Sequence, residues 1–129
     1  DDMHELAELV CTDPGVGGHY LVEDLANQYK ERLAKGFGRN YYVRLGGKML
    51  VHVATYAENQ ELAITSGLVA GKTEGILGYG SILEGCLFGD LLAEGKRVFT
   101  FTTSAIRDKY LKISGAVQCG EYMKLVKKR

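Results

Sequence analysis

The stretch best suited to chemistry is a glycine-bearing turn between a β-rich run and a helix. The run spans residues 61–70, and the helix begins near Ser81 with apolar residues three and four positions apart. The turn holds four glycines: Gly71, Gly75, Gly78 and Gly80. A strand that enters a helix through glycines leaves backbone N–H groups pointing outward at the positive end of the helix dipole. The sequence therefore predicts a phosphate-binding site in this turn.

Cysteine and histidine do not form a metal or disulfide pattern. The three cysteines, Cys11, Cys86 and Cys119, stand at wide and irregular spacing, which favours reduced thiols over a disulfide framework. Cys86 falls among the apolar residues of the expected helix, so we interpret it as a packing residue. His4 and His19 are isolated in the sequence, and no metal site is expected.

The length and the net charge of the chain describe one domain without a strong electrostatic field. The chain has 129 residues, and its 16 basic and 16 acidic side chains cancel. This balance argues against nucleic acid or an anionic membrane as a partner. The apolar runs are too short to span a membrane, and reduced thiols without a signal peptide favour a cytoplasmic protein. Because the sequence opens with Asp1-Asp2-Met3, we expect a processed or excised piece of a longer chain.

Periodicity and turn residues divide the chain into nine expected elements. Helices are predicted at 3–10, 21–35, about 81–94 and 105–113, and strands at 41–45, 48–56, 61–70, 97–102 and 116–126. Gly46-Gly47 is typical of a two-residue hairpin, so the first three strands form an antiparallel meander. A right-handed crossover through the third helix makes strands 61–70 and 97–102 parallel. The order predicts an α/β fold with a mixed sheet and helices on both faces.

Three stretches, in this order, resemble the GNAT superfamily of N-acetyltransferases. They are YYVRLGGKMLVHVATYAE followed by ELAITSGLVA, then GILGYGSILEGCLFGDLLAEGK, and finally RDKYLKISGAVQCGEYMKL. The second is similar to the family's acetyl-CoA signature, and the third to its closing pattern of Tyr, Lys, Gly and a terminal strand. The resemblance covers about residues 21–126. It implies a GNAT-like acetyl-CoA-binding domain at 21–129, with residues 1–20 as an N-terminal segment, the remnant of a longer chain.

The resemblance also implies roles for particular residues. Backbone groups of Leu68, Val69 and Ala70 would hold the pantetheine arm of acetyl-CoA. The amides that would hold its diphosphate are those of Gly75, Ile76, Leu77, Gly78, Tyr79, Gly80 and Ser81. Tyr110 matches the family's tyrosine near the sulfur and would protonate the departing thiolate as a general acid. The reaction would be direct attack of an amine on the thioester, without a covalent enzyme intermediate and without a metal.

The general base and the acceptor, a small-molecule or peptide amine, stay open at this point. Glu58 and Glu61 lie near the turn of the meander, and His52 lies in the adjoining strand. His52 alternates with apolar neighbours, which is typical of a structural histidine, and Glu58 is typical of a turn carboxylate. Tyr110 shares a helix face with apolar residues, so a core role weighs as much as a catalytic one.

Departures from the family's pattern keep other interpretations open. Gly75 stands where the family has a basic residue or Gln, and Glu74 brings an acid close to the expected diphosphate. Both favour a catalytically silent domain that binds acyl-CoA or another domain. No clear strand precedes Leu21, which leaves a missing N-terminal domain or a homodimer open. A third interpretation, a nucleotide-binding α/β domain, would need a Lys-Ser/Thr pair that GYGSI lacks.

Overall fold

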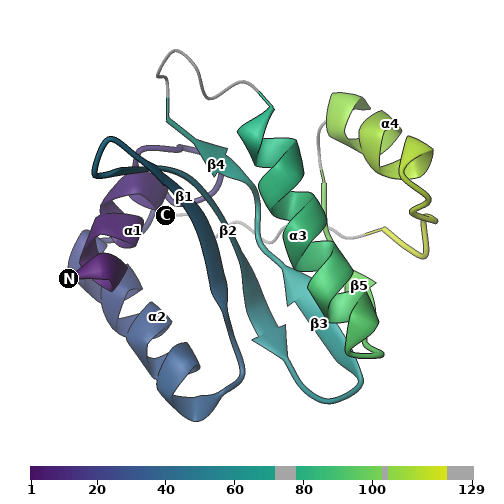
Figure 1. The fold of residues 1–129 in the computed structure, drawn as a ribbon, viewed down its shortest axis with the longest axis horizontal. Helices are drawn as coiled ribbons and strands as arrows, with labels where there is room; N and C mark the ends of the chain where they lie inside the picture. The colour runs from purple at the N-terminus through teal and green to yellow at the C-terminus, as the bar shows by residue number, and fades with distance from the viewer. Residues whose placement is uncertain (72–77, 103–104, 122–129) are drawn as a thin grey trace, which may run out of the picture.

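The structure is a computed structural model that describes residues 1–71, 78–102 and 105–121. Figure 1 shows its elements, whose bounds are α1 (Asp2–Cys11), α2 (Val22–Lys35), β1 (Asn40–Leu45), β2 (Lys48–Glu58), β3 (Leu62–Thr65), β4 (Val69–Ala70), α3 (Tyr79–Ala93), β5 (Arg97–Phe99) and α4 (Ala105–Ile113). The predicted helices and the hairpin are confirmed. Gly46 and Gly47 have φ angles of 58° and 77°, as a two-residue hairpin turn requires.

The strands form a mixed sheet in the order β1-β2-β3-β5, with β4 paired to β2. β1 and β3 each run antiparallel to β2, and β3 runs parallel to β5. The predicted meander and the predicted parallel pair are therefore confirmed. The crossover from the meander to β5 runs through α3, which places the start of that helix beyond the end of β4.

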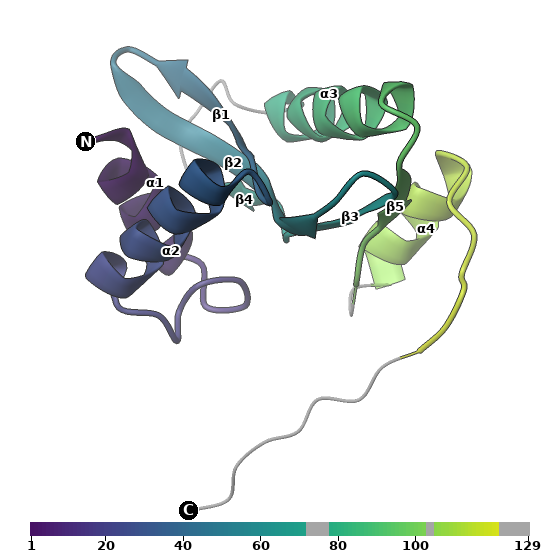
Figure 2. The same ribbon diagram turned by 90° about the horizontal axis from the view of Figure 1, so that it is seen from below.

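Helices cover both faces of the sheet, as predicted (Figure 2). α1 and α2 pack on one face, and the core there consists of Leu6, Ala7, Val10, Leu25, Ala26, Tyr29, Met49 and Val69. α3 packs on the other face, and that core consists of Leu50, Val51, Val53, Ala63, Leu83, Leu87 and Leu91. β2 contributes to both cores and is buried continuously from Met49 to Thr55. Its two apolar faces thus produce the layered arrangement.

α1 is an integral part of the first core. Leu6 and Ala7 are fully buried and Val10 nearly so, all of them packed with α2 and β2. α2 ends as its sequence predicts, because Gly36 adopts the left-handed conformation at φ 75°. The proposed boundary at residue 21 therefore lies within a shared core, and the division into segment and domain stays a prediction.

The strand predicted at 61–70 is broken, which corrects the sequence-based expectation. β3 ends at Thr65 and β4 begins at Val69. The Ser66 hydroxyl accepts a hydrogen bond from the Ala54 N–H at 2.9 Å and donates one to the Gly67 carbonyl at 3.0 Å. A serine side chain that bonds locally competes with the regular strand ladder. We call residues 66–68 the strand break.

Two further expectations were wrong in part. The apolar residues of α3 do not form one buried face: Leu83, Leu87 and Leu91 are buried, whereas Ile82, Cys86 and Leu92 are exposed. Apolar residues surround this helix, so their spacing alone could not select the face, and Cys86 is not a packing residue. The strand predicted at 116–126 is absent from residues 116–121, which are exposed. Residues 122–126 lie outside the described part of the chain.

Candidate active site

The N-terminus of α3 presents backbone N–H groups that no side chain caps. The helix begins after Gly78, whose φ of 89° suits glycine, and its first backbone bond runs from the Ile82 N–H to the Gly78 carbonyl at 3.2 Å. In the described part of the chain, no hydrogen bond satisfies the N–H groups of Tyr79, Gly80 and Ser81. Uncapped amides at the positive end of a helix dipole suit an anion.

The far edge of β4 is open beside this helix start. The pairing of β3 with β5 ends at Ile64 and Phe99, and among the described strands β4 pairs with β2 alone. The Gly71 N–H donates to the Leu50 carbonyl of β2 at 2.7 Å. Because backbone groups alternate along a strand, those of Val69 face β2 and those of Ala70 face the open edge. An extended ligand can therefore pair with this edge as an additional strand.

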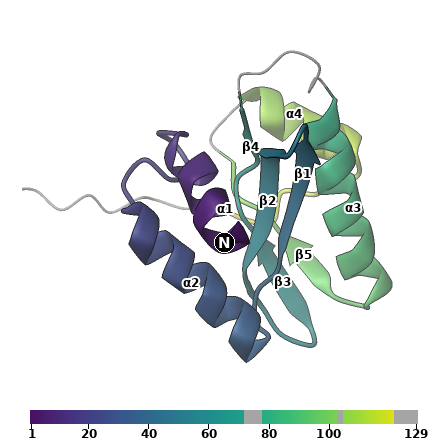
Figure 3. The same ribbon diagram turned by 60° about the vertical axis from the view of Figure 1, so that its left-hand side comes forward.

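The open edge and the helix start adjoin one another. A Cβ atom placed on Gly80 would lie 2.8 Å from Leu68 Cδ2, so the first turn of α3 packs directly on the strand break. Figures 1 and 3 both place β4 and the beginning of α3 at the same end of the sheet. The structure thus brings Leu68 against Gly80, with Val69 and Ala70 of β4 at the same end of the sheet as the start of α3. The other predicted ligands, Gly75, Ile76 and Leu77, lie outside the described residues.

Tyr110 lies on α4, and an ion pair of Arg107 joins this helix to α3. Arg107 Nη2 lies 2.7 Å from Glu84 Oε2, and the Glu84 side chain is buried. The guanidinium of Arg107 lies 5.4 Å from the centre of the Tyr110 ring. Tyr110 is 37% exposed, whereas Leu111 is the buried residue of α4. The phenol is therefore available to a ligand rather than part of the core.

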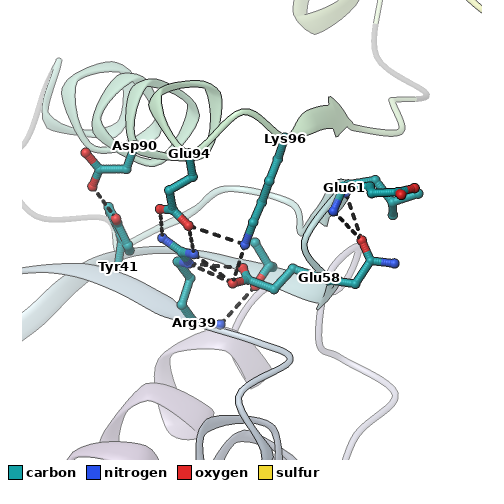
Figure 4. A network of polar contacts seen from close by, with 10 residues as sticks. Arg39, Tyr41, Glu58, Glu61, Asp90, Glu94 and Lys96 are labelled. Carbon is teal, nitrogen blue, oxygen red and sulfur yellow. Dashed lines mark hydrogen bonds and ion pairs between the residues drawn. The ribbon is translucent and has the colours of Figure 1, made fainter.

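Two of the general-base candidates lie far from this helix start. Glu58 belongs to a polar network that joins the end of β2 to the end of α3 (Figure 4). The Arg39 guanidinium binds Glu58 at 2.7 Å and Glu94 at 2.7 Å, and Lys96 lies 3.2 Å from Glu58. Since α3 has 15 residues, the network lies about 20 Å from its N-terminus. Glu61 lies at the same end, on the turn after β2.

The charge state of Glu58 also argues against a role for this residue as the general base. Burial acts to raise the pKa of its carboxyl, but hydrogen bonds from Arg39, Thr55 and Lys96 outweigh burial and hold the pKa below its usual range. Glu94 has a pKa lowered to about 2, chiefly by its hydrogen bonds with Arg39. Carboxylates held in this way are poor proton acceptors, so the network is a structural clamp.

His52 is buried and electrically neutral. Its Nε2 atom lies 2.9 Å from Asn40 Oδ1, and its ring stacks obliquely 5.5 Å from that of Tyr29. Burial lowers the pKa of His52 to about 4. The interpretation as a structural histidine is supported by this burial. Its partner across the sheet is nevertheless Val69 of β4, so His52 lies one strand from the open edge.

A group of tyrosines near the strand break escaped the sequence analysis. Tyr20, Tyr29 and Tyr56 line a cavity together with Arg32, His52 and Ser66. These residues come from the α1–α2 loop, α2, β2 and the strand break, so no local motif connects them. Alternation on β2 could have placed His52 and Tyr56 on one face, but the partners on α2 required the tertiary structure.

Other site classes find no support in the described part of the chain. Residues 1–71, 78–102 and 105–121 contain no group of three or more His, Cys, Asp or Glu side chains arranged to hold a metal. None of the helices described there has the length and apolar character needed to cross a membrane. The three cysteines are free thiols.

No protein-family model matches the sequence, and no curated protein matches it. Solved structures match over almost the whole chain. The enzyme AAC(6')-Iy in complex with the bisubstrate analogue CoA-S-monomethyl-acetylneamine superposes with a TM-score of 0.74 at 10% identity, covering 98% of this chain and 92% of that one. A predicted acetyltransferase from Clostridium acetobutylicum with acetyl-CoA superposes with a TM-score of 0.71 at 10% identity, covering 96% and 87%.

A third match is the ribosomal-protein-alanine N-acetyltransferase from Brucella melitensis biovar Abortus 2308, with a TM-score of 0.67 at 14% identity and coverage of 99% and 93%. The chain has the GNAT acetyltransferase fold. The resemblance noted in the sequence is thereby confirmed at the level of fold. Within the GNAT fold of this chain, the open β4 edge and the uncapped start of α3 form the candidate active site.

Proposed function

We propose that this protein is an N-acetyltransferase that transfers the acetyl group of acetyl-CoA to an amine. The observation that carries the proposal is the open edge of β4 beside the uncapped N-terminus of α3. An open strand edge suits the amide-bearing pantetheine arm, and free helix amides suit a diphosphate. Support also comes from neighbours of the same fold whose structures contain CoA or acetyl-CoA.

The start of α3 and the open edge of β4 together define the direction in which acetyl-CoA would lie. The diphosphate would lie against the amides of Gly78–Ser81, and the resemblance adds those of Gly75, Ile76 and Leu77, which lie outside the described residues. The arm then runs from Ala70 past Val69 to Leu68, which places the thioester beside the strand break. Acetyl-CoA supplies the activated carbonyl carbon that the amine attacks.

The chain's own groups orient the reactants and move one proton. As the C–N bond forms, electrons move onto the carbonyl oxygen, and a backbone N–H at the open edge stabilises that oxyanion. The C–S bond then breaks, and the Tyr110 hydroxyl donates its proton to the departing thiolate as a general acid. The proton that the attacking nitrogen loses passes through water to the resulting phenolate, which restores the phenol. Holding both substrates in one orientation supplies most of the acceleration, so no covalent enzyme intermediate is required.

Titration calorimetry with acetyl-CoA, combined with a thiol-release assay over a panel of amines, tests the proposal. We expect saturable binding and release of one thiol per acetylated amine. Tyr110→Phe should lower kcat by about a hundredfold or more, since it removes only the general acid. Tyr42→Phe, on the half-buried face of β1, is the matched control and should retain full turnover.

The same two assays identify the alternatives. Binding of acetyl-CoA without thiol release by any amine would support the silent acyl-CoA-binding domain. Absence of binding would refute the acetyl-CoA site itself. Turnover that survives Tyr110→Phe undiminished would leave the acetyltransferase standing but remove Tyr110 as the acid.

A further inference from the structure

The tyrosine-lined cavity has the character of a binding site. It is enclosed by α2, the α1–α2 loop, β2 and the strand break, and its lining residues are Val10, Val16, Tyr20, Leu25, Tyr29, Arg32, His52, Ala54, Tyr56 and Ser66. The enclosed volume is about 10 Å³, room for one group the size of a water molecule or an amine nitrogen. Of the lining residues, Tyr56 is 40% exposed.

One of the residues that line this cavity, His52, carries a buried acceptor atom without a partner. His52 Nε2 lies against Asn40 Oδ1, an acceptor, so Nε2 carries the proton and Nδ1 carries a lone pair. Nδ1 is buried and has no hydrogen-bond partner, while the residue as a whole is 1% exposed. A buried acceptor left without a partner is costly in a folded protein. A ligand donor such as an amine N–H would satisfy this atom.

Arg32 places an unbalanced positive charge at the same site. Its guanidinium lies 5.9 Å from the ring centre of Tyr29 and 6.0 Å from that of Tyr56. One of its nitrogens donates to Gln28 Oε1 at 3.1 Å, and no carboxylate forms an ion pair with it in the described part of the chain. The two rings fix the guanidinium in place, and its remaining donors match the two oxygens of a carboxylate.

The position of Arg32 is built into the fold. A Cβ atom on Gly38 would lie 2.9 Å from Arg32 Cβ and 3.1 Å from its Cδ. Only a residue without a side chain leaves room for the stem of Arg32 at this point. The guanidinium is therefore held at the rim of the cavity by the backbone beside it as well as by the two tyrosine rings.

The cavity lies where the proposed reaction would take place. Ser66 of the strand break lines it, and Val16 of the α1–α2 loop packs so closely on Gly67 that a Cβ there would lie 2.7 Å from Val16 Cγ2. Burial and the Tyr20 phenol raise the pKa of Tyr56, and the backbone amide of Gly67 partly offsets them. Tyr56 and Ser66 line the same cavity, so Tyr56 lies near the strand break, at which the arm along Leu68–Ala70 would present its thioester.

We propose that this cavity is the acceptor site and that the acceptor is a primary amine bearing a carboxylate, with Arg32 binding the carboxylate and His52 Nδ1 accepting a hydrogen bond from the amine. The inference rests on the proposed acetyl transfer and specifies its second substrate. Amines that carry further positive charge are poor acceptors, because the guanidinium repels them.

The test compares matched acceptors in the thiol-release assay. Amino acids and their carboxamides present the same amine with and without the carboxylate, and kcat/KM is expressed per unprotonated amine. We expect the amino acids to exceed their carboxamides at least tenfold. Arg32→Gln should reduce that ratio to near one. Arg97→Gln is the matched control, since Arg97 also stacks on a ring, Phe99 at 5.8 Å, and should leave the ratio unchanged. Equal rates for acids and carboxamides, or an unchanged ratio in Arg32→Gln, overturn the proposal.

A binding measurement separates this proposal from the acetyltransferase itself. Tyrosine fluorescence and the ¹⁵N resonances of His52 are titrated with N-acetylated amino acids and their carboxamides, without acetyl-CoA. We expect the ¹⁵N resonances of His52 to shift saturably with the N-acetylated amino acids and not with their carboxamides. Arg32→Gln should abolish this shift. If no amine supports turnover, the acetyltransferase fails, and this titration still decides whether the cavity binds a carboxylate ligand. A response identical for acids and carboxamides overturns the carboxylate site even in an active enzyme.

Discussion

His52 shows how one buried residue makes stability depend on pH. The ring is neutral in the fold because burial lowers its pKa from an ordinary value near 6.5 to about 4. The unfolded chain takes up a proton at this residue as the pH falls below about 6.5, and the folded chain does not. The stability that neutral His52 contributes is therefore complete above that pH and is lost as the pH falls toward 4.

We expect the free energy of unfolding to fall by roughly 3 kcal/mol between pH 7 and pH 4 on account of this residue, as urea denaturation across that range would measure. His52→Gln should flatten this slope, since Gln keeps a donor for Asn40 and does not titrate. The exposed His19 provides the control, and His19→Gln should leave the slope as it was. A wild-type stability that stays constant from pH 7 to pH 4.5 would contradict the prediction.

The residues of the candidate site differ in how well the sequence predicted them. Gly78–Ser81 were expected from the glycines before a helix, and Leu68–Ala70 from the resemblance to the GNAT family; both roles stay predictions. The group around Arg32 and Tyr56 joins α2 to β2 and to the strand break. The proximity of these residues depends on the register of β2, and that register shifts between Thr55 and Ala57. A sequence pattern cannot supply such a shift.

At the scale of elements, the close packing of α3 on the strand break predicts an effect on binding. Gly80→Ala would place a methyl group 2.8 Å from Leu68 Cδ2, so the Leu68 side chain must shift at the strand break, where the arm of acetyl-CoA is proposed to lie. We expect about tenfold weaker binding of acetyl-CoA, measured by calorimetry. Gly85→Ala, in the same helix with open space around it, is the control and should stabilise the protein by about 0.5–1 kcal/mol without a change in affinity. Equal affinities for both variants would show that this contact does not shape the site.

The charged network at the other end of α3 predicts an effect on stability alone. Arg39 joins Glu58, whose side chain is 8% exposed, to Glu94 of α3. Arg39→Gln leaves these carboxylates with Lys96 as their one cationic partner in the described part of the chain. We expect a loss of stability of about 2 kcal/mol, between the values for exposed and for broken buried pairs. Lys35→Gln, which removes an exposed pair with Glu31, should cost less than about 0.5 kcal/mol. Urea denaturation gives both numbers, and equal losses would refute the clamp.

The sequence predicted the boundaries of helices and turns more reliably than it predicted which residues are buried. Gly36 ended α2 and Gly46-Gly47 closed the hairpin because both conformations depend on the glycines themselves. The strand break did not follow, because Ser66 and Gly67 occur within a run that is otherwise typical of a strand. Its cause is tertiary, namely the bond of Ser66 to Ala54 and the approach of Val16 to Gly67. The open edge that carries the proposed function is thus the feature that the sequence showed least.

At the scale of the whole molecule, the two cores have separate tasks. The core under α3 fixes the helix start against β4, and so positions the proposed diphosphate site. The core under α1 and α2 contains Tyr29 and packs against Val16 and Tyr20 of the α1–α2 loop. All three residues also line the proposed acceptor site. β2 belongs to both cores, which makes it the element through which the two proposed substrates are held in one geometry.

The place of α1 in one of the two cores predicts that residues 1–20 cannot be removed without loss of the fold. α1 contributes Leu6, Ala7 and Val10 to the core, and its loss would expose the apolar residues of α2 and β2 that pack against them. At about 25 cal/mol per Å² of apolar surface, three buried side chains contribute several kcal/mol, a large part of the stability of a domain this size. We expect a chain of residues 21–129 to lack cooperative thermal unfolding by circular dichroism. Leu6→Ala in the full chain should lower stability by about 3 kcal/mol, whereas the exposed Leu33→Ala should have little effect. A cooperative transition in the 21–129 chain would instead support residues 1–20 as a dispensable segment.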